Sequence, residues 1–495
     1  MDLLNSAQQL TNEYIDKMPK AMRKKYGQFF TSAETAQFMA NLFEIPSDKE
    51  ELSFLDAGAG SGMLSIALIE RIEKLDCLKK LHLVCYENDE NILDLLKQNL
   101  DNAKNRVSFA FDYELRSINY ITSQEKNYRS LLASNGNPEQ YDLVIGNPPY
   151  MKIPKDAPEA LAMPDVCYGA PNLYFLFASM GLYNLKKNGQ LVYIVPRSWT
   201  SGAYFKAFRQ KFLGEASLEH IHLFVSRDKV FDKETVLQET MIFKVRKTSI
   251  RPKDVFITTT KDNSDFKDKT SFAVPYNVVV SGGDSYVFLP TCQQEVEVIE
   301  KLNKWTDTLP SIGLKMKTGL TVDFRNRDVL RNEKSQQTVP LFYSQHIKNG
   351  KVIFPIGKEN EYIETDQKGL LQANTNYLFV KRFTAKEEPR RLQCGVYLAR
   401  KNPDYESIST QNKINFINGL EKLSECIVYG LYVLFNSTLY DGFYRILNGS
   451  TQVNSTEVNA MPVPPISIIE AMGKKLIRLH NMSVQSCDAI LEEYV

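Results

Sequence analysis

The sequence lacks the features of a disulfide-bonded or metal-binding protein. Its 495 residues include only seven cysteines, which are scattered and odd in number and form no Cys-x-x-Cys pair. Cysteines used in this way are typical of a reducing compartment. We find no set of histidines, cysteines or acids with the spacing of a metal site. We therefore expect no bound metal and a structural or surface role for the histidines of HIH (220–222).

Long apolar runs are also missing. A membrane-spanning helix needs about 18 consecutive apolar residues, and the richest stretch, Tyr174–Leu185, is interrupted by serine and glycine. The first residues, MDLLNSAQQLTNEY, include acids and lack the apolar segment of a secretory signal. We therefore expect a cytoplasmic, prokaryotic-type protein that does not bind a membrane.

A strong net charge is absent as well, because 60 lysines and arginines stand against 59 aspartates and glutamates. A nucleic-acid partner would have to be held by a local basic patch. Two such patches are present. Residues 17–25 carry five basic residues and no acid, and residues 301–400 carry 18 basic against 10 acidic residues. The alternative interpretation of either patch is a solvated surface.

The pattern of strands and helices predicts the fold class. A hydrophobic content of 43% and a charged content of 24% are those of a globular protein, and the length suits two to four domains. From Leu52 onward, short apolar strands alternate with helical segments, which indicates an α/β fold whose parallel sheet is covered by helices on both faces. Residues 237–245 predict a late strand at the antiparallel edge. The other expected strands are 53–57, 81–87, 106–111, 141–146, 190–196 and 218–224.

The pattern changes near Lys247, where short β-like pieces and turn sequences replace the regular alternation. We expect a catalytic domain over residues 1–247 and an α+β domain over residues 248–465. The apolar spacing of residues 466–495 predicts a C-terminal helix.

A glycine-rich turn follows the first expected strand. The run DAGAGSG (56–62) begins with Asp56 and places Gly58 and Gly60 between that strand and the next helix. Glycines allow a sharp turn and the close approach of a ligand, and the alternative is a tight turn without one. Glu87 ends the next strand, where a carboxylate can accept hydrogen bonds from both ribose hydroxyls. An acid at the turn suits the ammonium group of S-adenosylmethionine (SAM) better than the pyrophosphate of NAD.

The strand over 141–146 is followed by Asn147-Pro148-Pro149-Tyr150. The prolines stiffen the chain and remove backbone donors, so the carbonyl and amide oxygens remain as acceptors, and Tyr150 offers a flat face. Such a pocket suits a planar group that carries an NH₂. Acceptors on both N–H bonds free the nitrogen lone pair and stabilise the positive charge that develops during methyl transfer. The alternative is a rigid turn that closes the strand.

The ordered set GQFFTS (27–32), DAGAGSG (56–62), YENDE (86–90), FDY (111–113) and NPPY (147–150) resembles the γ class of amino-methyltransferases. These are the N6-adenine DNA methyltransferases of type II restriction–modification systems. The likeness covers roughly residues 20–245 and extends to the longer, PstI-like branch of enzymes with a Taq-like catalytic domain. It implies a Rossmann-like SAM-dependent methyltransferase sheet and a C-terminal target-recognition domain that binds double-stranded DNA.

The resemblance also implies the cofactor-binding residues. Thr31 and its neighbours would hold the methionine carboxylate of SAM, and Asp56 would bind the methionine end. Glu87 would bind the ribose. Asp112 would bind the amino group of the cofactor adenine, and Tyr113 would stack on that adenine where the family often has phenylalanine.

The same resemblance assigns the target side of the site. Asn147 and the Pro148 carbonyl would bind the target amine, and Tyr150 would stack on the target base. Phe231 would form a second aromatic wall, with Phe224 as a competing candidate and core packing as the alternative for either. Because the base lies in a duplex, the enzyme would flip it out, at a cost of a few kcal/mol that aromatic stacking offsets.

The segment YLFVKRFTAKEEPRRL (377–392) alternates aromatic and basic residues. We expect its basic side chains to contact DNA phosphates or base edges. The alternative is that its arginines pair with Glu387 and Glu388 on a solvated surface. The four expected DNA-binding residues are Lys381, Arg382, Arg390 and Arg391.

Several alternatives remain open at this point. An RNA adenine-N6 methyltransferase or a protein-glutamine methyltransferase would share the NPPY pocket, but neither explains a C-terminal half with a basic centre. A non-catalytic DNA-binding specificity subunit would not need a complete SAM and NPPY set. The resemblance favours N6-adenine over N4-cytosine methylation, because asparagine precedes the PPY. It implies a monomeric modification enzyme that protects DNA from a cognate restriction endonuclease on another chain.

Overall fold

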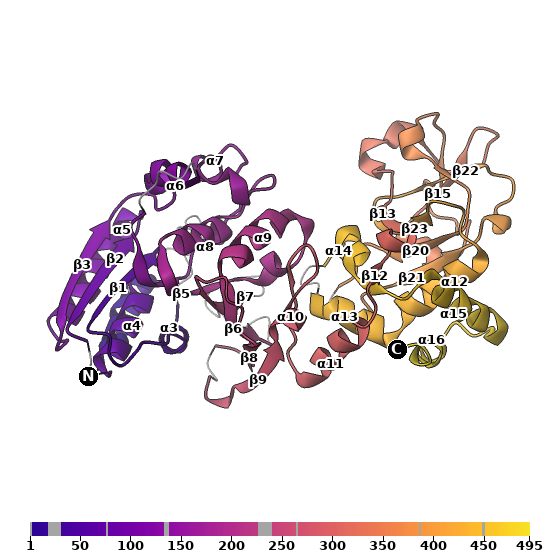
Figure 1. Ribbon diagram of the computed structural model, residues 1–495. Helices are drawn as coiled ribbons and strands as arrows, with labels where there is room; N and C mark the ends of the chain where they lie inside the picture. The colour runs from indigo at the N-terminus through magenta and orange to yellow at the C-terminus, as the bar shows by residue number, and fades with distance from the viewer. Residues whose placement is uncertain are drawn as a thin grey trace. The chain divides into compact units, whose positions relative to one another are not determined.

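The computed structural model describes residues 2–17, 31–75, 78–132, 138–225, 240–263, 266–385, 388–447 and 451–495. The chain divides into two compact units, both drawn in Figure 1. Unit 1 contains residues 1–200 and 204–291, and unit 2 contains residues 201–203 and 292–495.

Unit 1 is built on a nine-stranded sheet. Its strands are β1 (Glu51–Ala57), β2 (Lys80–Tyr86), β3 (Ala110–Arg116), β4 (Tyr141–Gly146), β5 (Leu185–Pro196), β6 (Ser217–Phe224), β7 (Thr240–Arg246), β8 (Asp254–Thr260) and β9 (Thr270–Pro275). They lie in the order β3-β2-β1-β4-β5-β7-β6-β8-β9. Strands β1 to β5 are parallel, whereas β7 runs antiparallel between β5 and β6. The expected parallel sheet and its late antiparallel strand are therefore confirmed, but the expected edge position of that strand is wrong, because β6, β8 and β9 lie beyond β7.

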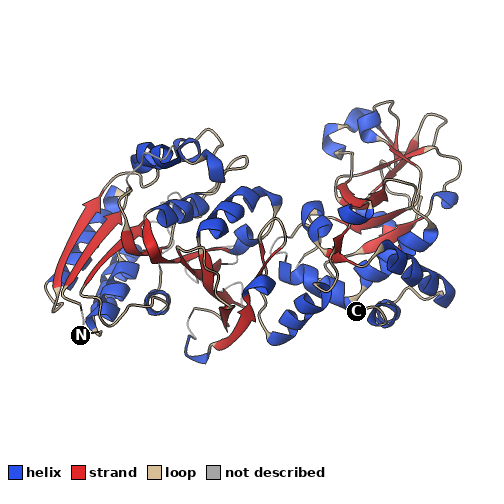
Figure 2. Cartoon of the chain, in the orientation of Figure 1, coloured by secondary structure: helices blue, strands red, loops and turns tan. Residues whose placement is uncertain are grey.

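Helices cover both faces of this sheet (Figure 2). Successive side chains of a strand point to opposite faces, and β4 illustrates this. Leu143 and Ile145 pack into the core that the first group of helices covers, whereas Val144 lies against Gly181 of the second group. The first group is α1 (Leu3–Lys17), α3 (Ala33–Asn41), α4 (Met63–Glu73) and α5 (Glu90–Lys104), and the second is α8 (Leu173–Tyr183) and α9 (Lys206–Glu215), with α6 (Glu125–Leu132) and α7 (Pro158–Ala162) beside α8.

The sheet extends past the expected domain boundary. Strand β8 pairs with β6 and strand β9 pairs with β8, so both belong to the sheet of unit 1 although they follow Lys247. A short helix, α10 (Tyr276–Val279), and the hairpin of β10 (Val280–Ser281) and β11 (Tyr286–Val287) follow. The boundary predicted at 247 is therefore wrong, and unit 1 ends at residue 291. The change in sequence pattern near Lys247 therefore coincides with the last two strands of the same sheet and not with a new domain.

Unit 2 contains two sheets that share an aromatic core. One consists of β13 (Leu314–Thr318), β23 (Ile414–Gly419), β20 (Tyr377–Lys381), β21 (Cys394–Tyr397), β17 (Lys351–Val352) and β16 (Ile347–Lys348). The other consists of β14 (Leu330–Arg331), β18 (Tyr362–Ile363), β15 (Val339–Phe342), β22 (Ser407–Thr410) and β19 (Gln372–Ala373). Phe342 of the second sheet packs on Phe379 and Tyr397 of the first, with ring centroids 5.6 and 5.0 Å away.

The C-terminal segment of unit 2 is not the single helix that the sequence predicts. Residues 466–495 form two helices that break at His480, whose φ is +50°. They belong to unit 2 because α15 packs along α12. The helices are α11 (Gln293–Leu302), α12 (Glu425–Asn436), α13 (Thr438–Leu447), α14 (Ser455–Ala460), α15 (Ile466–Leu479) and α16 (Val484–Glu492), and the short strands β12 (Asp307–Thr308) and β24 (Pro462–Val463) pair beside them.

The contact between α12 and α15 depends on two glycines and gives a stability prediction. A Cβ on Gly430 would lie 1.7 Å from the Ile469 carbonyl oxygen, and a Cβ on Gly473 would lie 1.7 Å from that of Cys426. Gly430→Ala should therefore separate the helices and destabilise unit 2 by about 1–3 kcal/mol or more. Gly442→Ala is the matched control, because its nearest neighbour lies 3.9 Å away. Thermal unfolding should show a lower melting temperature for Gly430→Ala alone, and equal values would contradict the packing.

Candidate active site

The carboxyl ends of three parallel strands bring the expected motifs to one edge of the sheet. Asp56 of β1 pairs in register with Cys85 of β2 and with Ile145 of β4. Glu87 follows β2 directly, and Asn147 follows β4 directly. Because neighbouring strands lie about 4.8 Å apart, the glycine-rich turn, the acid after β2 and the NPPY segment begin side by side.

The glycine-rich turn has the backbone that its sequence predicts. Gly58, Gly60 and Gly62 have φ angles of +76°, +57° and +83°, in the left-handed region that glycine adopts without strain. The Gly58 N–H donates to the Tyr86 carbonyl over 2.8 Å, which ties the turn to the end of β2. A Cβ on Gly60 would meet no atom within 4 Å, so the turn is open on that side.

Glu87 links the turn to helix α5. Its Oε2 accepts a hydrogen bond from the Gly60 N–H over 2.8 Å, and its Oε1 accepts one from the Asp89 N–H over 2.9 Å. The side chain is nearly buried, and this burial raises the pKa of the Glu87 carboxyl above its usual range. Each oxygen can accept a second hydrogen bond, so the pair suits the two hydroxyls of a ribose.

Asp56 is fully buried beneath the turn. Its Oδ2 accepts a hydrogen bond from the Ser65 hydroxyl over 2.7 Å, whereas its Oδ1 has no donor among the described residues. Burial raises the pKa of Asp56 to about 7, and the nearby Glu87 carboxylate adds to the shift. A buried carboxylate oxygen without a donor is costly. A ligand ammonium at this edge fits that unmatched acceptor.

The NPPY segment forms a small polar network. The Asn147 Nδ2 donates to the Thr31 hydroxyl oxygen over 3.1 Å, which fixes the Asn147 Oδ1 on the other side as an acceptor. The Tyr150 hydroxyl donates to that Oδ1 over 2.8 Å and lies 3.1 Å from the Ile194 carbonyl. Thr31 and Pro148 are buried. The structure thus brings Thr31, 116 residues away in sequence, to Asn147.

Gly146 sets the approach of the NPPY segment to the sheet. Gly146 pairs in register with Tyr193 of β5, and a Cβ on Gly146 would lie 2.7 Å from the Tyr193 ring. Only glycine therefore allows β4 to end against this buried ring. The motif NPPY does not include this position, and the register of β4 with β5 is what identifies it.

The structure does not bring Asp112 and Tyr113 to the site. Strand β3 begins at Ala110, later than expected, and Asp112 pairs in register with His82. Asp112 therefore lies four residues, or about 13 Å, before the carboxyl end of β3. Its carboxylate lies 2.6 Å from the His82 Nδ1, and the Tyr113 hydroxyl bonds to Asp101 on α5. The role expected for both residues in binding the cofactor adenine is corrected.

Other residues lie at the carboxyl end of β3. Arg116 ends the strand, donates to the Tyr86 hydroxyl over 2.8 Å and stacks on the Tyr86 ring at 5.4 Å. Ile118 follows with half of its surface exposed. An exposed apolar side chain at this edge could pack against a planar ring. Sequence analysis missed Ile118 because the strand was placed four residues too early.

Some expected residues lie outside the described part of the chain or in the core. Phe231 and most of GQFFTS and of residues 17–25 fall outside it. Phe224, the competing aromatic wall, is 4% exposed and packs edge-on against His222 at 4.7 Å. Phe224 is therefore a core residue, as the simpler interpretation held.

Two of the four expected DNA-binding residues have structural roles. Arg391 is 1% exposed, its Nε donates to the Thr384 hydroxyl over 3.2 Å, and it lies over the Tyr444 ring. Arg390 donates to the Ser437 carbonyl over 2.7 Å at the end of α12. Burial contradicts the prediction that Arg391 contacts DNA, whereas the prediction for half-buried Arg390 stays a prediction. Lys381 donates to Gln393 and Arg382 to the Asn412 carbonyl, at half-buried positions.

The described residues contain neither a metal-binding cluster nor a membrane-spanning helix. Within the described ranges no group of three or more His, Cys, Asp or Glu side chains could hold a metal ion. His220 and His222 bond to Thr258, which is the structural role expected for them. In the same part of the chain, no helix combines the length and the apolar character that crossing a membrane requires.

Comparison with known proteins decides the family. The profile of the Eco57I restriction-modification methylase family matches residues 69–231. The chain is 34% identical over 485 residues to the type II methyltransferase M.PstI of Providencia stuartii, which covers 96% of this chain and 93% of that protein. It is 33% identical over 481 residues to the type II methyltransferase M.BsuBI of Bacillus subtilis, which covers 95% and 94%. The chain belongs to the type II methyltransferases.

The family membership gives the general activity. The chain is a site-specific DNA methyltransferase of a restriction–modification type, with SAM as its cofactor and DNA as a partner. The type IIL restriction-modification enzyme MmeI in complex with DNA has a TM-score of 0.52 at 10% identity, which covers 89% of this chain and 70% of that chain. A nuclease-deletion mutant of the type ISP enzyme LlaGI in complex with a DNA substrate mimic also reaches 0.52, at 12% identity and 96% and 56% coverage. Both likenesses agree with the expected Rossmann-like methyltransferase fold.

The raised pKa of Asp56 gives a pH prediction. Because the pKa of Asp56 is about 7, its carboxyl is mostly neutral at lower pH. A neutral carboxyl cannot form an ion pair with the SAM ammonium. Affinity for SAM should therefore rise between about pH 6 and pH 8 and then level off. Asp56→Asn, which cannot ionise, should bind SAM more weakly without this rise. Calorimetric titration at each pH measures both, and parallel curves for the two proteins would contradict the role of Asp56.

Proposed function

We propose that the chain transfers the methyl group of SAM to N6 of an adenine flipped out of double-stranded DNA. The observation that carries the proposal is the pairing of β1 with β4, which sets Asp56 and Asn147 at one edge of the sheet. Asp56 offers an acceptor for the amino-acid end of the cofactor. Asn147 offers an acceptor for an exocyclic amine.

In this proposal the residues after β1 and β2 bind the cofactor. Asp56 Oδ1 accepts from the ammonium group, and the Glu87 oxygens accept from the ribose while they keep the Gly60 and Asp89 N–H bonds. Thr31 accepts from Asn147 and retains its own proton to donate to the methionine carboxylate. Gly58 and Gly60 leave the turn free of side chains. SAM, when bound, supplies a methyl group on a sulfonium, so no metal or strong base is needed to activate it.

The target amine meets the NPPY segment. Thr31 holds the Asn147 amide so that Oδ1 is the acceptor, and the amine replaces the Tyr150 hydroxyl on that oxygen. The Pro148 carbonyl accepts the second N–H bond. Both acceptors stabilise the charge that develops on nitrogen, and the Tyr150 ring stacks on the base. Phe231 remains the proposed second aromatic wall.

The partners follow from the same proposal. Unit 2 acts as the target-recognition domain, since sequence readout needs base-edge and phosphate contacts beyond the catalytic pocket. The chain acts as a monomer in the cytoplasm of a prokaryotic cell. A cognate restriction endonuclease is a separate chain that recognises the same sequence and is a functional partner only.

A labelling experiment with site variants tests the proposal. With tritiated SAM, the wild-type chain should label duplex DNA that contains one short sequence and should leave tRNA and protein unlabelled. Asn147→Ala should lower the single-turnover rate by about 10²–10³ because a transition-state acceptor is lost. Its SAM dissociation constant should stay close to wild type. Tyr150→Phe keeps the stacking ring and should be milder than Tyr150→Ala.

The control for these variants is Asn105→Ala, at the exposed end of α5. It should change neither the rate nor SAM binding. Label in RNA or protein but not in DNA would contradict the assigned substrate. If Asn147→Ala mainly weakened SAM binding, Asn147 would belong to the cofactor site and its assigned role would be wrong.

A further inference from the structure

Three loops of unit 2 are joined by backbone hydrogen bonds into one surface. The Asn412 N–H donates to the Thr321 carbonyl over 2.8 Å, which ties the turn after β22 to the loop after β13. The Arg382 N–H donates to the Lys413 carbonyl over 2.9 Å, and the Arg382 Nη1 donates to the Asn412 carbonyl over 3.1 Å. The end of β20 therefore lies beside the same turn. Phe324 lies three residues past Thr321 in the joined loop.

Aromatic and basic side chains are exposed on this surface. Phe324 is 61% exposed and Phe383 is 46% exposed. Single exposed apolar residues are common. Here, however, an arginine guanidinium lies over each of the two exposed rings. The Arg325 guanidinium lies 5.5 Å from the Phe324 ring centroid, and that of Arg382 lies 5.6 Å from the Phe383 centroid.

The charge and hydrogen-bonding groups of this surface match a nucleic acid. Arg325 and Lys413 are exposed, and neither is among the cations in the described ion pairs. The backbone of Asn412 makes the hydrogen bonds of the turn, and its half-buried side-chain amide makes none with the described residues. An asparagine amide can bond the edge of an adenine in the major groove, and exposed basic side chains neutralise phosphates. Stacked aromatic–arginine pairs suit bases and sugars.

We propose that this surface, defined by Phe324, Arg325, Arg382, Phe383, Asn412 and Lys413, is the DNA-reading face of unit 2. Lys413 and Arg325 contact phosphates, and Asn412 reads a base edge. Arg382 acts as a positioning residue, because its guanidinium holds the backbone of the Asn412 turn. The inference rests on the proposed function, in which unit 2 recognises the target sequence. It moves DNA contact away from the buried Arg391 to side chains that solvent can reach.

Two substitutions test the face without disturbing the core. Lys413→Ala should weaken binding about equally for duplexes with and without the methylated sequence and should lower the salt slope by about 0.9. Asn412→Ala keeps both backbone bonds and should reduce discrimination at one base pair, by roughly 5- to 150-fold. Fluorescence anisotropy over a salt series, and methylation of single-base variants of the sequence, measure these effects.

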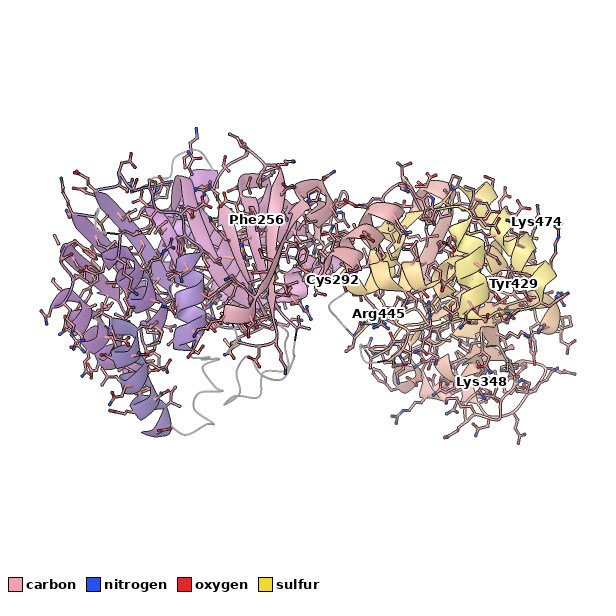
Figure 3. The ribbon with its side chains drawn as sticks, turned by 90° about the horizontal axis from the view of Figure 1, so that it is seen from below. Phe256, Cys292, Lys348, Tyr429, Arg445 and Lys474 are labelled. Carbon is pink, nitrogen blue, oxygen red and sulfur yellow. The ribbon has the colours of Figure 1, made fainter. Side chains whose placement is uncertain are left out.

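Matched controls separate this inference from general damage. Lys348, labelled in Figure 3, is an exposed lysine on β16, the edge strand opposite β13 in the six-stranded sheet. Lys348→Ala should leave DNA affinity, salt slope and sequence choice unchanged. The melting temperature and the SAM dissociation constant should be unchanged in all three variants.

The outcomes are distinguishable. If the wild-type chain methylates a specific DNA sequence while Lys413→Ala and Asn412→Ala behave like Lys348→Ala, the face is wrong and the proposed function stands. A changed oligomeric state in analytical ultracentrifugation with unchanged DNA binding would assign the surface to a second copy of the chain. If the wild-type chain methylates no DNA, the proposed function fails and this inference fails with it.

Discussion

The pairing of β1 with β4 is the constraint on which the rest of the site depends. Asp56 and Ile145 are in register, so the acid of the glycine-rich turn and the amide of Asn147 leave the sheet on neighbouring strands. A slip of one residue would turn every side chain of β4 to the other face. The apolar faces of β4 prevent this, because Leu143 and Ile145 pack into one core while Val144 packs on α8. Core packing thereby fixes the spacing of Asp56 and Asn147, to which the proposal assigns the cofactor and the target.

Polar groups at this edge are arranged to be completed by ligands. Glu87 ties the glycine-rich turn to α5 and still has lone pairs to offer, and Asp56 keeps one buried oxygen without a donor among the described residues. Their burial raises the pKa of both carboxyls, which costs stability unless a cation or donor arrives. Asn147 differs from Asp56, because Thr31 and Tyr150 already bond its amide. In the proposed function the ligand supplies the missing donors, so these costs favour its binding.

The features of the fold that depend on local sequence patterns were predicted correctly from the sequence. The central strands, the left-handed glycines and the NPPY segment follow from short apolar runs, turn chemistry and proline, and the structure has them. Asp112 was misplaced because β3 is an edge strand whose start is set by pairing with β2 and not by its own residues. Arg391 was misread because alternation of aromatic and basic residues does not reveal that Tyr444, 53 positions later, covers its guanidinium. Both errors concern contacts between distant residues, and sequence spacing does not encode these.

The identity of the methylated atom tests the central claim most directly. The account assigns Asn147 and Pro148 to hold an exocyclic amine, so the product must be methylated on such a nitrogen. Methylated duplex can be digested to nucleosides, and these can be separated and identified by mass spectrometry against standards. The account predicts N6-methyldeoxyadenosine as the methylated product. Recovery of 5-methyldeoxycytidine would contradict amine chemistry at this edge, and recovery of N4-methyldeoxycytidine would contradict the choice of adenine.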